Sequence, residues 1–482
     1  MMKSPDTGFL YPDFVYDFMK QNLFSDSIAA ISTPLSEGGI SIIRISGPDS
    51  LTIADSFLVT KSGAAFVLHM ASHTIHYGFV KDTDGQIVDE VLVSVFLAPK
   101  SYTGENTVEI NCHGGILVTK KVLDLCLLHG ARLADPGEFS KRGFLNGRMD
   151  LSQAEAVMDL ISAKSEAAAA SSVRQLGGAL SAKVRELRRI LLHETAFLEA
   201  ALDDPEHYSL EGYPERCDQI MTEVSDSIEA LLRTAHNGRL LREGINTVIL
   251  GRPNTGKSSL LNLLVGHERA IVTHISGTTR DTIEEDIFLD RIGLHLIDTA
   301  GVRSAADEVE RIGIDKAINL ASSADLILYV IDGSEPLCEE DRNLIDRFSD
   351  RKMLLLVNKH DLEAAFSAEE AEAFFGSLPI VFLSARTGEG LSEIQDYIQR
   401  IFYDGSLSSN SDTIVTNVRH EQALREALES IRLVRQSIAS GVEEDFYTVD
   451  LMNAYSSLGK ILGESLEDDL VSEIFSSFCM GK

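Results

Sequence analysis

Long apolar runs are missing from this sequence, and their absence excludes a helical membrane protein. No run approaches the roughly 18–20 consecutive apolar residues that a bilayer-spanning helix needs. The N-terminal residues 1–23 mix aromatic with acidic side chains and lack the apolar core of a secretory signal. We therefore expect a cytoplasmic chain without membrane contact, and we interpret residues 1–23 as an extension of unknown role.

Cysteine is scarce, and acidic residues outnumber basic ones. The five cysteines are scattered, odd in number and without paired metal-ligand spacing: Cys112, Cys126, Cys217, Cys338 and Cys479. This pattern predicts reduced thiols rather than a disulfide framework. A formal net charge of −31 argues against a protein that coats nucleic acid without specificity. The basic stretch Arg185–Arg189 stays open to two interpretations, a local nucleic-acid contact or a solvated helix face.

The first part of the chain has the pattern of strands. The length of 482 residues predicts about three domains, and residues 24–146 form the first. Ile40–Ser46 and Val91–Leu97 are apolar strand candidates bounded by turn residues. In the next candidate, residues 108–112, Glu109 faces away from the side shared by the apolar residues. We predict an α+β domain.

Two segments with helical periodicity flank the middle of the chain. Within residues 147–243, an apolar stripe at helical spacing runs from Ala154 to Ile161. Within residues 405–482, a second stripe runs from Leu424 to Val434. Each apolar face must be buried. We therefore predict that the two segments pair into one helical domain, with residues 244–404 inserted between them.

Residues 251–258 (GRPNTGKS) match a phosphate loop in the required context. The apolar run Ile245–Leu250 before the loop predicts a buried strand, and Ser259–Val265 after it predicts a helix. The N–H groups at a helix N-terminus and its dipole favour a bound phosphate. Lys257 would pair with the β- and γ-phosphates, and the Ser258 hydroxyl would ligate Mg²⁺.

A second motif identifies the base. Asn358–Asp361 (NKHD) follows the predicted strand Met353–Val357. The Asp361 carboxylate can accept hydrogen bonds from the guanine N1–H and 2-amino groups, which adenine does not offer in that arrangement. Ser384–Arg386, after the predicted strand Ile380–Leu383, suits a backbone contact to the guanine oxygen. With DTAG at residues 298–301, the ordered motifs predict a site for GTP and GDP.

The catalyst for hydrolysis is not evident in these motifs. Ras-like enzymes orient the attacking water with a Gln after the DxxG glycine, but that position is Val302 here. Thr279 is a natural second Mg²⁺ ligand, and Asp298 would hold the metal through water. The Asn254 carbonyl could place a monovalent cation beside the phosphates. The acids of Asp307–Arg311 could reach the water or could be solvated charges at a helix start.

Several longer segments resemble one family, the MnmE (TrmE) tRNA modification GTPases. They include GGISIIRISG, SYTGENTVEINCHGG, PGEFSKRGFLNGRMDLSQAEA, GRPNTGKSSLLN, SGTTRD, DTAGVR, DEVERIGI and FSSFCMGK, and the resemblance covers nearly everything after about residue 25. It implies a multidomain α/β fold. A folate-binding-like α+β domain would span residues 24–146. A helical domain in two parts, 147–243 and 405–482, would be split by an inserted Ras-like P-loop G domain at 244–404.

The resemblance implies GTP hydrolysis activated by potassium, with G domains that dimerise across the nucleotides. Glu310 would orient the attacking water, and Lys257 and Asn254 complete the catalytic set. The implied metal ligands are Asn254, Thr273, Ile275 and Thr278 for K⁺, and Ser258 and Thr279 for Mg²⁺. The implied GTP contacts are Asn254, Thr255, Gly256, Lys257, Ser258, Ser259, Thr273, His274, Ile275, Ser276, Gly277, Thr278, Thr279, Asp298, Thr299, Ala300, Gly301, Asn358, Lys359, Asp361, Ser384, Ala385 and Arg386.

The family's N-terminal domain is similar to the folate-binding domains of aminomethyltransferases and forms a constitutive homodimer. The resemblance implies a 5-formyl-tetrahydrofolate or related folate bound by Arg44, Glu109, Arg148 and Lys482. A carboxylate such as Glu109 can accept two hydrogen bonds from a pterin edge. Without the family, these are ordinary surface side chains. Cys479, in the terminal CMGK motif, suits covalent or acid–base chemistry or a structural role, and both stay open.

The implied reaction forms the carboxymethylaminomethyl or aminomethyl group at C5 of the wobble uridine (position 34) in tRNA. Its partner would be an MnmG (GidA)-type flavoprotein, in a heterotetramer or larger complex, which would supply FAD because this sequence has no dinucleotide-binding fingerprint. One alternative is a ribosome-assembly GTPase switch, but no second G domain or KH module is visible in the sequence. Another is a folate-dependent one-carbon transferase with a regulatory G domain.

Overall fold

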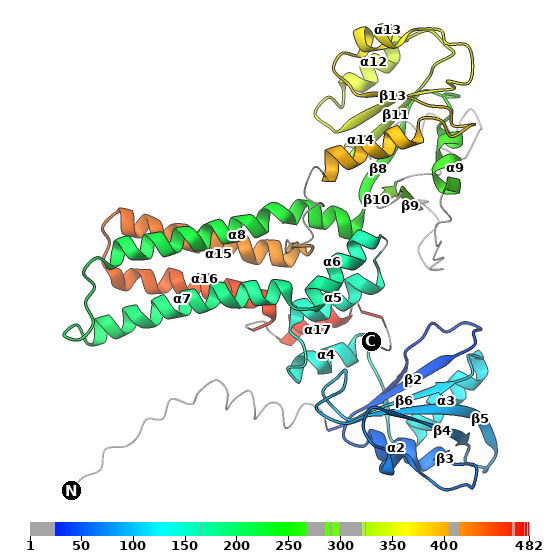
Figure 1. Ribbon diagram of the computed structural model, residues 1–482, viewed down its shortest axis with the longest axis vertical. Helices are drawn as coiled ribbons and strands as arrows, with labels where there is room; N and C mark the ends of the chain where they lie inside the picture. Colours follow the sequence, from blue (N-terminus) through cyan, green and yellow to red (C-terminus); the bar gives the residue numbers. More distant parts are fainter. Residues whose placement is uncertain are drawn as a thin grey trace. The chain divides into compact units, whose positions relative to one another are not determined.

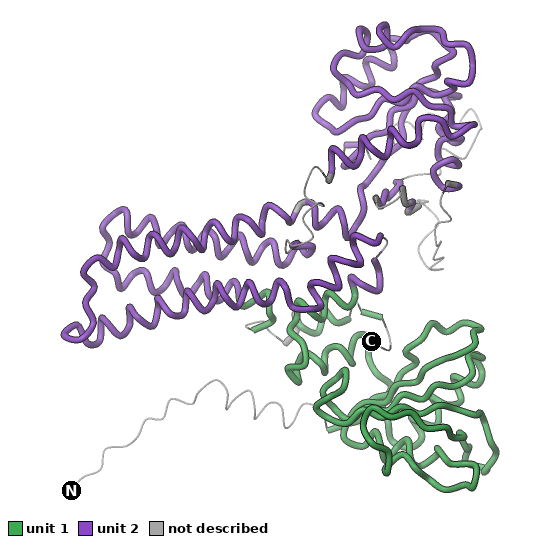
Figure 2. Tube along the Cα trace, in the orientation of Figure 1, with its two compact units in different colours: residues 1–158, 459–482 green, residues 159–458 purple. Residues whose placement is uncertain are grey.

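The computed structural model describes most of the chain as two compact units. The described residues are 25–163, 165–267, 285–289, 292–297, 321–322, 324–403, 414–464, 468–476, 478–479 and 481. One unit comprises residues 1–158 and 459–482, and the other comprises residues 159–458 (Figure 2). Within the described ranges, no helix combines the length and the apolar character needed to cross a membrane.

The first unit is built on a seven-stranded sheet with the order β3-β4-β5-β6-β2-β1-β7 (Figure 1). Its strands are β1 (Ile28–Ile31), β2 (Ser41–Ser46), β3 (Leu58–Val59), β4 (Thr74–Lys81), β5 (Ile87–Phe96), β6 (Thr107–Cys112) and β7 (Arg132–Leu133). The helices α2 (Ser50–Phe57) and α3 (Ile116–Leu128) contact this sheet. The strands predicted at Ile40–Ser46 and Val91–Leu97 are confirmed as β2 and the second half of β5.

The two faces of this sheet differ as the alternation in β6 predicts. Val108, Ile110 and Cys112 are at most 2% exposed and belong to the core that α2 and α3 complete. Glu109 lies on the opposite face, where its partner in the antiparallel register is Arg44 of β2. Because successive side chains of a strand point to opposite faces, Arg44 and Glu109 are positioned together by the sheet.

The end of the chain belongs to the first unit. Helix α17 (Asp468–Ser476) packs against α4 (Glu138–Leu145), with Phe475 buried in the same cluster as Phe144. Ser32 then donates from Oγ to the Gly481 carbonyl at 3.0 Å. Gly481 has φ of +84°, and an added Cβ would lie 2.2 Å from the Ile31 carbonyl oxygen. Only glycine fits there, so Gly481 is held beside β1.

Helices form the larger part of the second unit outside its sheet. They are α6 (Glu166–Leu176), α7 (Ala179–Asp203), α8 (Tyr213–Glu243), α15 (Val418–Ala439) and most of α16 (Tyr447–Leu462) (Figure 1). Helix α5 (Leu151–Ile161), whose residues up to 158 belong to the first unit, precedes them. The predicted stripe from Leu424 to Val434 is confirmed as the buried face of α15, which packs along α8. The stripe from Ala154 lies in α5, but its last residue, Ile161, is 47% exposed because the helix ends there.

A six-stranded sheet with the order β13-β12-β11-β8-β10-β9 lies in the same unit. Its strands are β8 (Ile245–Leu250), β9 (Glu285–Leu289), β10 (Ile292–Leu296), β11 (Leu326–Asp332), β12 (Met353–Asn358) and β13 (Ile380–Phe382), and its helices are α9 (Lys257–His267), α12 (Glu339–Asp346), α13 (Ala368–Phe375) and α14 (Leu391–Tyr403). All pairs except β9–β10 are parallel. The carboxyl ends of β8, β11, β12 and β13 therefore meet at one edge, where ligands of such sheets bind.

Candidate functional site

The phosphate loop, residues 251–256, joins the carboxyl end of β8 to the first turn of α9. Asn254 has left-handed backbone geometry, with φ of +64°, and an exposed side chain. Lys257 donates from Nζ to the carbonyl oxygens of Gly251 at 3.0 Å and Arg252 at 2.7 Å. Since the N–H groups of a helix start also favour anions, the predicted strand, loop and helix form a cationic cradle suited to phosphate.

Asn358, at the end of β12, ties the phosphate loop to the segment Ser384–Arg386. Its Nδ2 donates to the Thr255 carbonyl at 2.8 Å, and its Oδ1 accepts from the Ala385 N–H at 2.9 Å. Gly256 permits this approach, because an added Cβ would lie 2.1 Å from the Asn358 Nδ2. Asn358 is buried. The phosphate loop, NKHD and SAR motifs therefore meet at one side chain.

Asp361 is held as an ionised acceptor beside this junction. Its Oδ1 accepts from the Ser384 Oγ at 2.6 Å, and its Oδ2 pairs with the Arg386 guanidinium at 2.8 Å. The hydrogen bond from Ser384, aided by the charge of Arg386, lowers the pKa of Asp361. Each carboxylate oxygen has a further lone pair, so both can still accept from a ligand. The pairing of Asp361 with Ser384 was not part of the sequence prediction.

Lys359 is fixed by an acid that the sequence reasoning missed. Its Nζ pairs with the buried carboxylate of Asp332, at the end of β11, and its backbone φ is +65°. Ser334 also donates to Asp332, from N at 3.0 Å and from Oγ at 2.6 Å. Burial alone would raise the pKa of Asp332, but the hydrogen bonds from Lys359 and Ser334 lower it. The sequence did carry a signal for Asp332: an acidic residue directly after an apolar run that is typical of a buried parallel strand.

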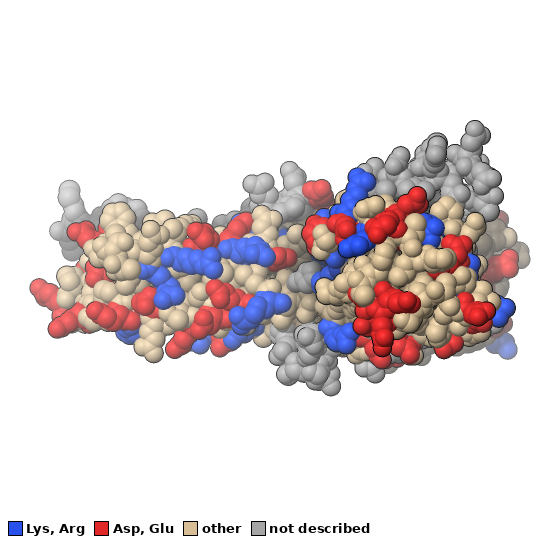
Figure 3. Space-filling model, turned by 90° about the horizontal axis from the view of Figure 1, so that it is seen from above, with Lys and Arg blue, Asp and Glu red and all other residues tan. Residues whose placement is uncertain are grey.

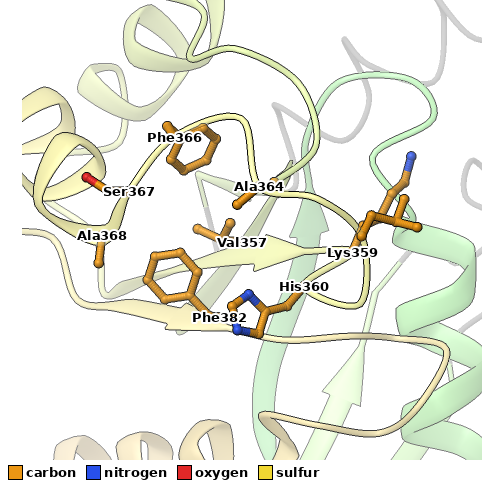
Figure 4. Close-up of a pocket in the computed structure, with 10 residues that line it drawn as sticks. Val357, Lys359, His360, Ala364, Phe366, Ser367, Ala368 and Phe382 are labelled. Carbon is orange, nitrogen blue, oxygen red and sulfur yellow. The ribbon is translucent and has the colours of Figure 1, made fainter.

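A cavity of 340 Å³ opens beside the NKHD segment. Its walls are mainly apolar, with Val357, Phe366 and Phe382 among them, and the His360 ring lies at its edge (Figure 4). The Lys359 side chain extends away from the cavity (Figure 4). Asn358, Asp361 and Ser384–Arg386 do not line it. Lys359 is thus the one predicted GTP contact among the residues that line the cavity, and the groups predicted to contact the guanine edge lie outside it.

Part of the predicted site lies outside the described residues. This holds for the loop Thr273–Thr279, for Asp298–Gly301, for Glu310 and for Lys482. Ser258, in the first turn of α9, is described and exposed. In the described part of the chain, no group of three or more His, Cys, Asp or Glu side chains could hold a metal ion.

In the N-terminal unit, the structure brings Arg44 and Glu109 into contact. The Arg44 Nε and Nη2 lie 2.9 and 2.8 Å from the Glu109 Oε1. The guanidinium also lies 5.1 and 5.5 Å from the ring centres of Tyr102 and Phe139. The Arg44 Nη1 is buried and has no hydrogen-bond partner among the described residues. Arg148 is exposed. Of the described residues predicted to bind folate, Arg44 and Glu109 are therefore the two that are largely buried and in contact.

The basic stretch Arg185–Arg189 has mixed surroundings. Arg188 is 7% exposed and stacks at 4.1 Å over the Tyr455 ring, which is a packing role. Arg185 and Arg189 are exposed. Figure 3 shows a face on which Lys and Arg side chains lie among Asp and Glu rather than in one continuous patch. The nucleic-acid interpretation of this stretch stays a prediction.

Comparisons with known proteins agree with the resemblance. Two family models match, described as the MnmE helical domain (residues 151–479) and the GTP-binding protein TrmE N-terminus (residues 27–148). Relatives named tRNA modification GTPase MnmE, from Lachnoclostridium phytofermentans and Bacillus velezensis, are 50% and 46% identical, each over 95% of this chain and 100% of the relative.

Among solved structures, the G domain of the T. maritima FeoB iron transporter aligns with 32% of this chain and 96% of its own, at 28% identity and a TM-score of 0.24. The chain belongs to the MnmE family, whose curated members compared above are named tRNA modification GTPases.

Proposed function

We propose that this GTPase is activated by potassium and works with an MnmG (GidA)-type flavoprotein. Together they would form the carboxymethylaminomethyl or aminomethyl group at C5 of the wobble uridine in tRNA, with a folate as one-carbon donor. The junction at Asn358 is the observation that best supports GTP binding, because it joins the phosphate loop to Ala385. The flanking Ser384 and Arg386 contact the ionised Asp361. The names of the full-length relatives support the tRNA half.

The tRNA half is tested in cells. Deleting the gene should remove the C5 group from wobble uridine, because no other step of the proposal supplies it. Mass spectrometry of nucleosides from purified tRNA measures this directly. Complementation with the wild-type gene should restore the modified nucleoside, whereas the Asp361→Asn gene should not. An unchanged nucleoside profile in the deletion strain would remove tRNA modification from the proposal.

On the nucleotide side, the chain's own groups would act on the phosphates. The Lys257 ammonium would exchange its loop carbonyls for β- and γ-phosphate oxygens, which are stronger acceptors. Ser258 and Thr279 would hold Mg²⁺; the exposed Ser258 hydroxyl suits this hard cation. Asn254, Thr273, Ile275 and Thr278 would hold K⁺, and Glu310 would orient the water. Bound cations would neutralise charge that develops on the phosphates.

The folate proposal rests on Arg44 and Glu109. The buried Nη1 of Arg44 has no protein acceptor among the described residues, which fits a polar ligand atom there. The Glu109 carboxylate has acceptor capacity left for a pterin edge. Ala30, the register partner of Arg44, neighbours Ile31, against which Gly481 packs. This neighbourhood supports a role for the terminal Lys482, with Arg148 as the remaining cation. The folate would donate one carbon.

Glu109→Gln should weaken binding of 5-formyl-tetrahydrofolate by about 10- to 100-fold, because charged hydrogen bonds are lost. Isothermal titration calorimetry of the full chain measures the affinity. GTP affinity in the same preparation should stay at the wild-type value. Asp84→Asn, in the exposed turn between β4 and β5, is the matched control for the loss of one charge. Equal folate affinity in the Glu109 variant and the wild type would exclude Glu109 from the site.

A homodimer is supported by the open face of the N-terminal sheet. Ile75, Tyr77 and Leu92 are 67%, 54% and 49% exposed. Register places them on the same face as Arg44 and Glu109, opposite the helices. Apolar side chains gathered on one face mark interaction surfaces. We infer that a second copy of the chain covers this face.

The arrangement of domains is also part of the proposal. Helices α8 and α15 lie on either side of the nucleotide-binding segment in sequence and pack along each other. This supports a helical domain, residues 147–243 and 405–482, split by a G domain at 244–404. GTP turnover would then open and close the dimer. FAD would belong to the flavoprotein partner, and we place the complex in the cytoplasm, where free cysteines such as Cys112 stay reduced.

A further inference from the structure

Arg252, the second residue of the phosphate loop, is tied to a distant helix. Its Nε donates to the Asp341 Oδ2 at 2.8 Å, although the two residues are 89 positions apart. Its Nη2 lies 3.5 Å from the Glu335 carboxylate. The guanidinium is 24% exposed, and the Asp341 side chain is 3% exposed. The contact between Arg252 and Asp341 is therefore a largely desolvated ion pair, unlike the mobile pairs of the surface.

The acid that receives Arg252 is itself fixed. Asp341 lies in the first turn of α12, where the helix dipole favours a carboxylate. Its Oδ1 accepts from the hydroxyl of Tyr329 at 3.0 Å. Tyr329 is fully buried in β11. Burial raises the pKa of Tyr329, and the adjacent Asp341 raises it further, so the hydroxyl stays protonated and donates.

The backbone of Arg252 holds the functional part of the loop. Its carbonyl oxygen accepts from the Thr255 Oγ1 at 3.0 Å and from the Lys257 Nζ at 2.7 Å. Asn254, two residues further on, has left-handed geometry that a non-glycine residue keeps only when its surroundings hold it. The side chain of Arg252 thus joins the loop to β11 and α12, while its carbonyl positions Thr255 and Lys257.

We propose that Arg252 is a positioning residue for GTP hydrolysis, acting through the buried pair with Asp341 and the hydroxyl of Tyr329. Asn358 holds the loop toward the base-recognition segments, and Arg252 holds it toward α12. The loop is therefore fixed on two sides. Loss of the second attachment would let Lys257 and Asn254 shift relative to the transferred phosphate. Small shifts of positioning groups cost catalysis more than binding, because the transition state has the stricter geometry.

The test compares Arg252→Met, Asp341→Asn and the double variant with the wild-type chain. We expect each single variant to lower kcat by about tenfold or more, while KM for GTP changes by less than about threefold. The double variant should be no slower than the slower single variant, because both substitutions break the same ion pair between Arg252 and Asp341. Tyr329→Phe removes only the hydroxyl and should lower kcat by a few-fold.

Glu339→Gln is the matched control, because Glu339 lies in the same helical turn as Asp341 but is 70% exposed. Its kcat should equal that of the wild type. Thermal unfolding of each variant separates positioning from folding. A lowered melting temperature with wild-type kcat for the folded protein would overturn the proposal. A double variant whose decrease in kcat equals the product of the two single decreases would also overturn it. If Arg252→Met does not fold, Tyr329→Phe and Asp341→Asn provide the test, with the same criterion of a lowered kcat and a nearly unchanged KM for GTP.

Discussion

Asp361→Asn should lower the affinity for GTP by about 10⁴-fold and allow xanthosine triphosphate to bind instead. The carboxylate of Asp361 is an acceptor only, and the hydrogen bond from Ser384 lowers its pKa and keeps it ionised. Guanine offers two donors, N1–H and the 2-amino group. Xanthine has a carbonyl oxygen in place of the amino group, and an Asn side chain offers one acceptor and one donor. The side-chain amide of the Asp361→Asn variant would therefore donate to the xanthine oxygen, at the position where the Asp361 carboxylate accepts from the guanine amino group.

Titration of the full chain with fluorescent GDP and XDP analogues measures both affinities. Asp350→Asn is the control for the loss of one charge, because Asp350 is 77% exposed on the same domain; it should bind GDP as the wild type does. GDP affinity within threefold of the wild type in Asp361→Asn would contradict the assignment of Asp361. A variant that binds neither base, with an unchanged melting temperature, would do the same.

The sequence predicted the local elements of this site well. The strand, loop and helix around residues 251–258 follow from an apolar run and a glycine-rich motif, and both are local signals. The alternation that places Glu109 opposite the buried residues of β6 is likewise local. Parallel strands buried on both faces, such as β11 and β12, have continuous apolar runs that mark them clearly.

The connections between elements were not predictable from the sequence. Asn358 and Thr255 are 103 positions apart, and Ser32 and Gly481 are 449 apart, so no local pattern links them. The pairing of Arg44 with Glu109 depends on the register of two strands, which a single sequence does not specify. The interpretation of Arg44 and Glu109 as exposed side chains is wrong, because they are 13% and 21% exposed and pair with each other. Their role as folate ligands stays a prediction.

GTP turnover should be at least about 10²-fold faster in K⁺ than in Na⁺, because a bound K⁺ would add to Lys257 in neutralising the charge that develops on the phosphates. Val302 occupies the position of the catalytic Gln in Ras-like enzymes, and an aliphatic side chain cannot orient water. Asn254 is exposed in the loop, two residues before Gly256, with its backbone already in the left-handed region. A cation of the size of K⁺ at its carbonyl would act where an arginine finger acts.

Two variants separate the side chain from the backbone at Asn254. Asn254→Ala removes the side-chain amide oxygen Oδ1, but it also places alanine at a backbone position with left-handed geometry, which strains it. Asn254→Gly removes the same oxygen without that strain. We expect both to turn over GTP equally slowly in K⁺ and in Na⁺, with GTP affinity near that of the wild type. A slow Ala variant beside a fully potassium-dependent Gly variant would assign the effect to the backbone alone.

The rate of GTP hydrolysis by the wild-type chain as a function of monovalent cation, at constant ionic strength and saturating Mg²⁺, tests the catalytic account most directly. We expect rapid turnover in K⁺, slow turnover in Na⁺, and loss of this difference in Asn254→Gly. Equal rates in K⁺ and Na⁺ for the wild-type chain would contradict it.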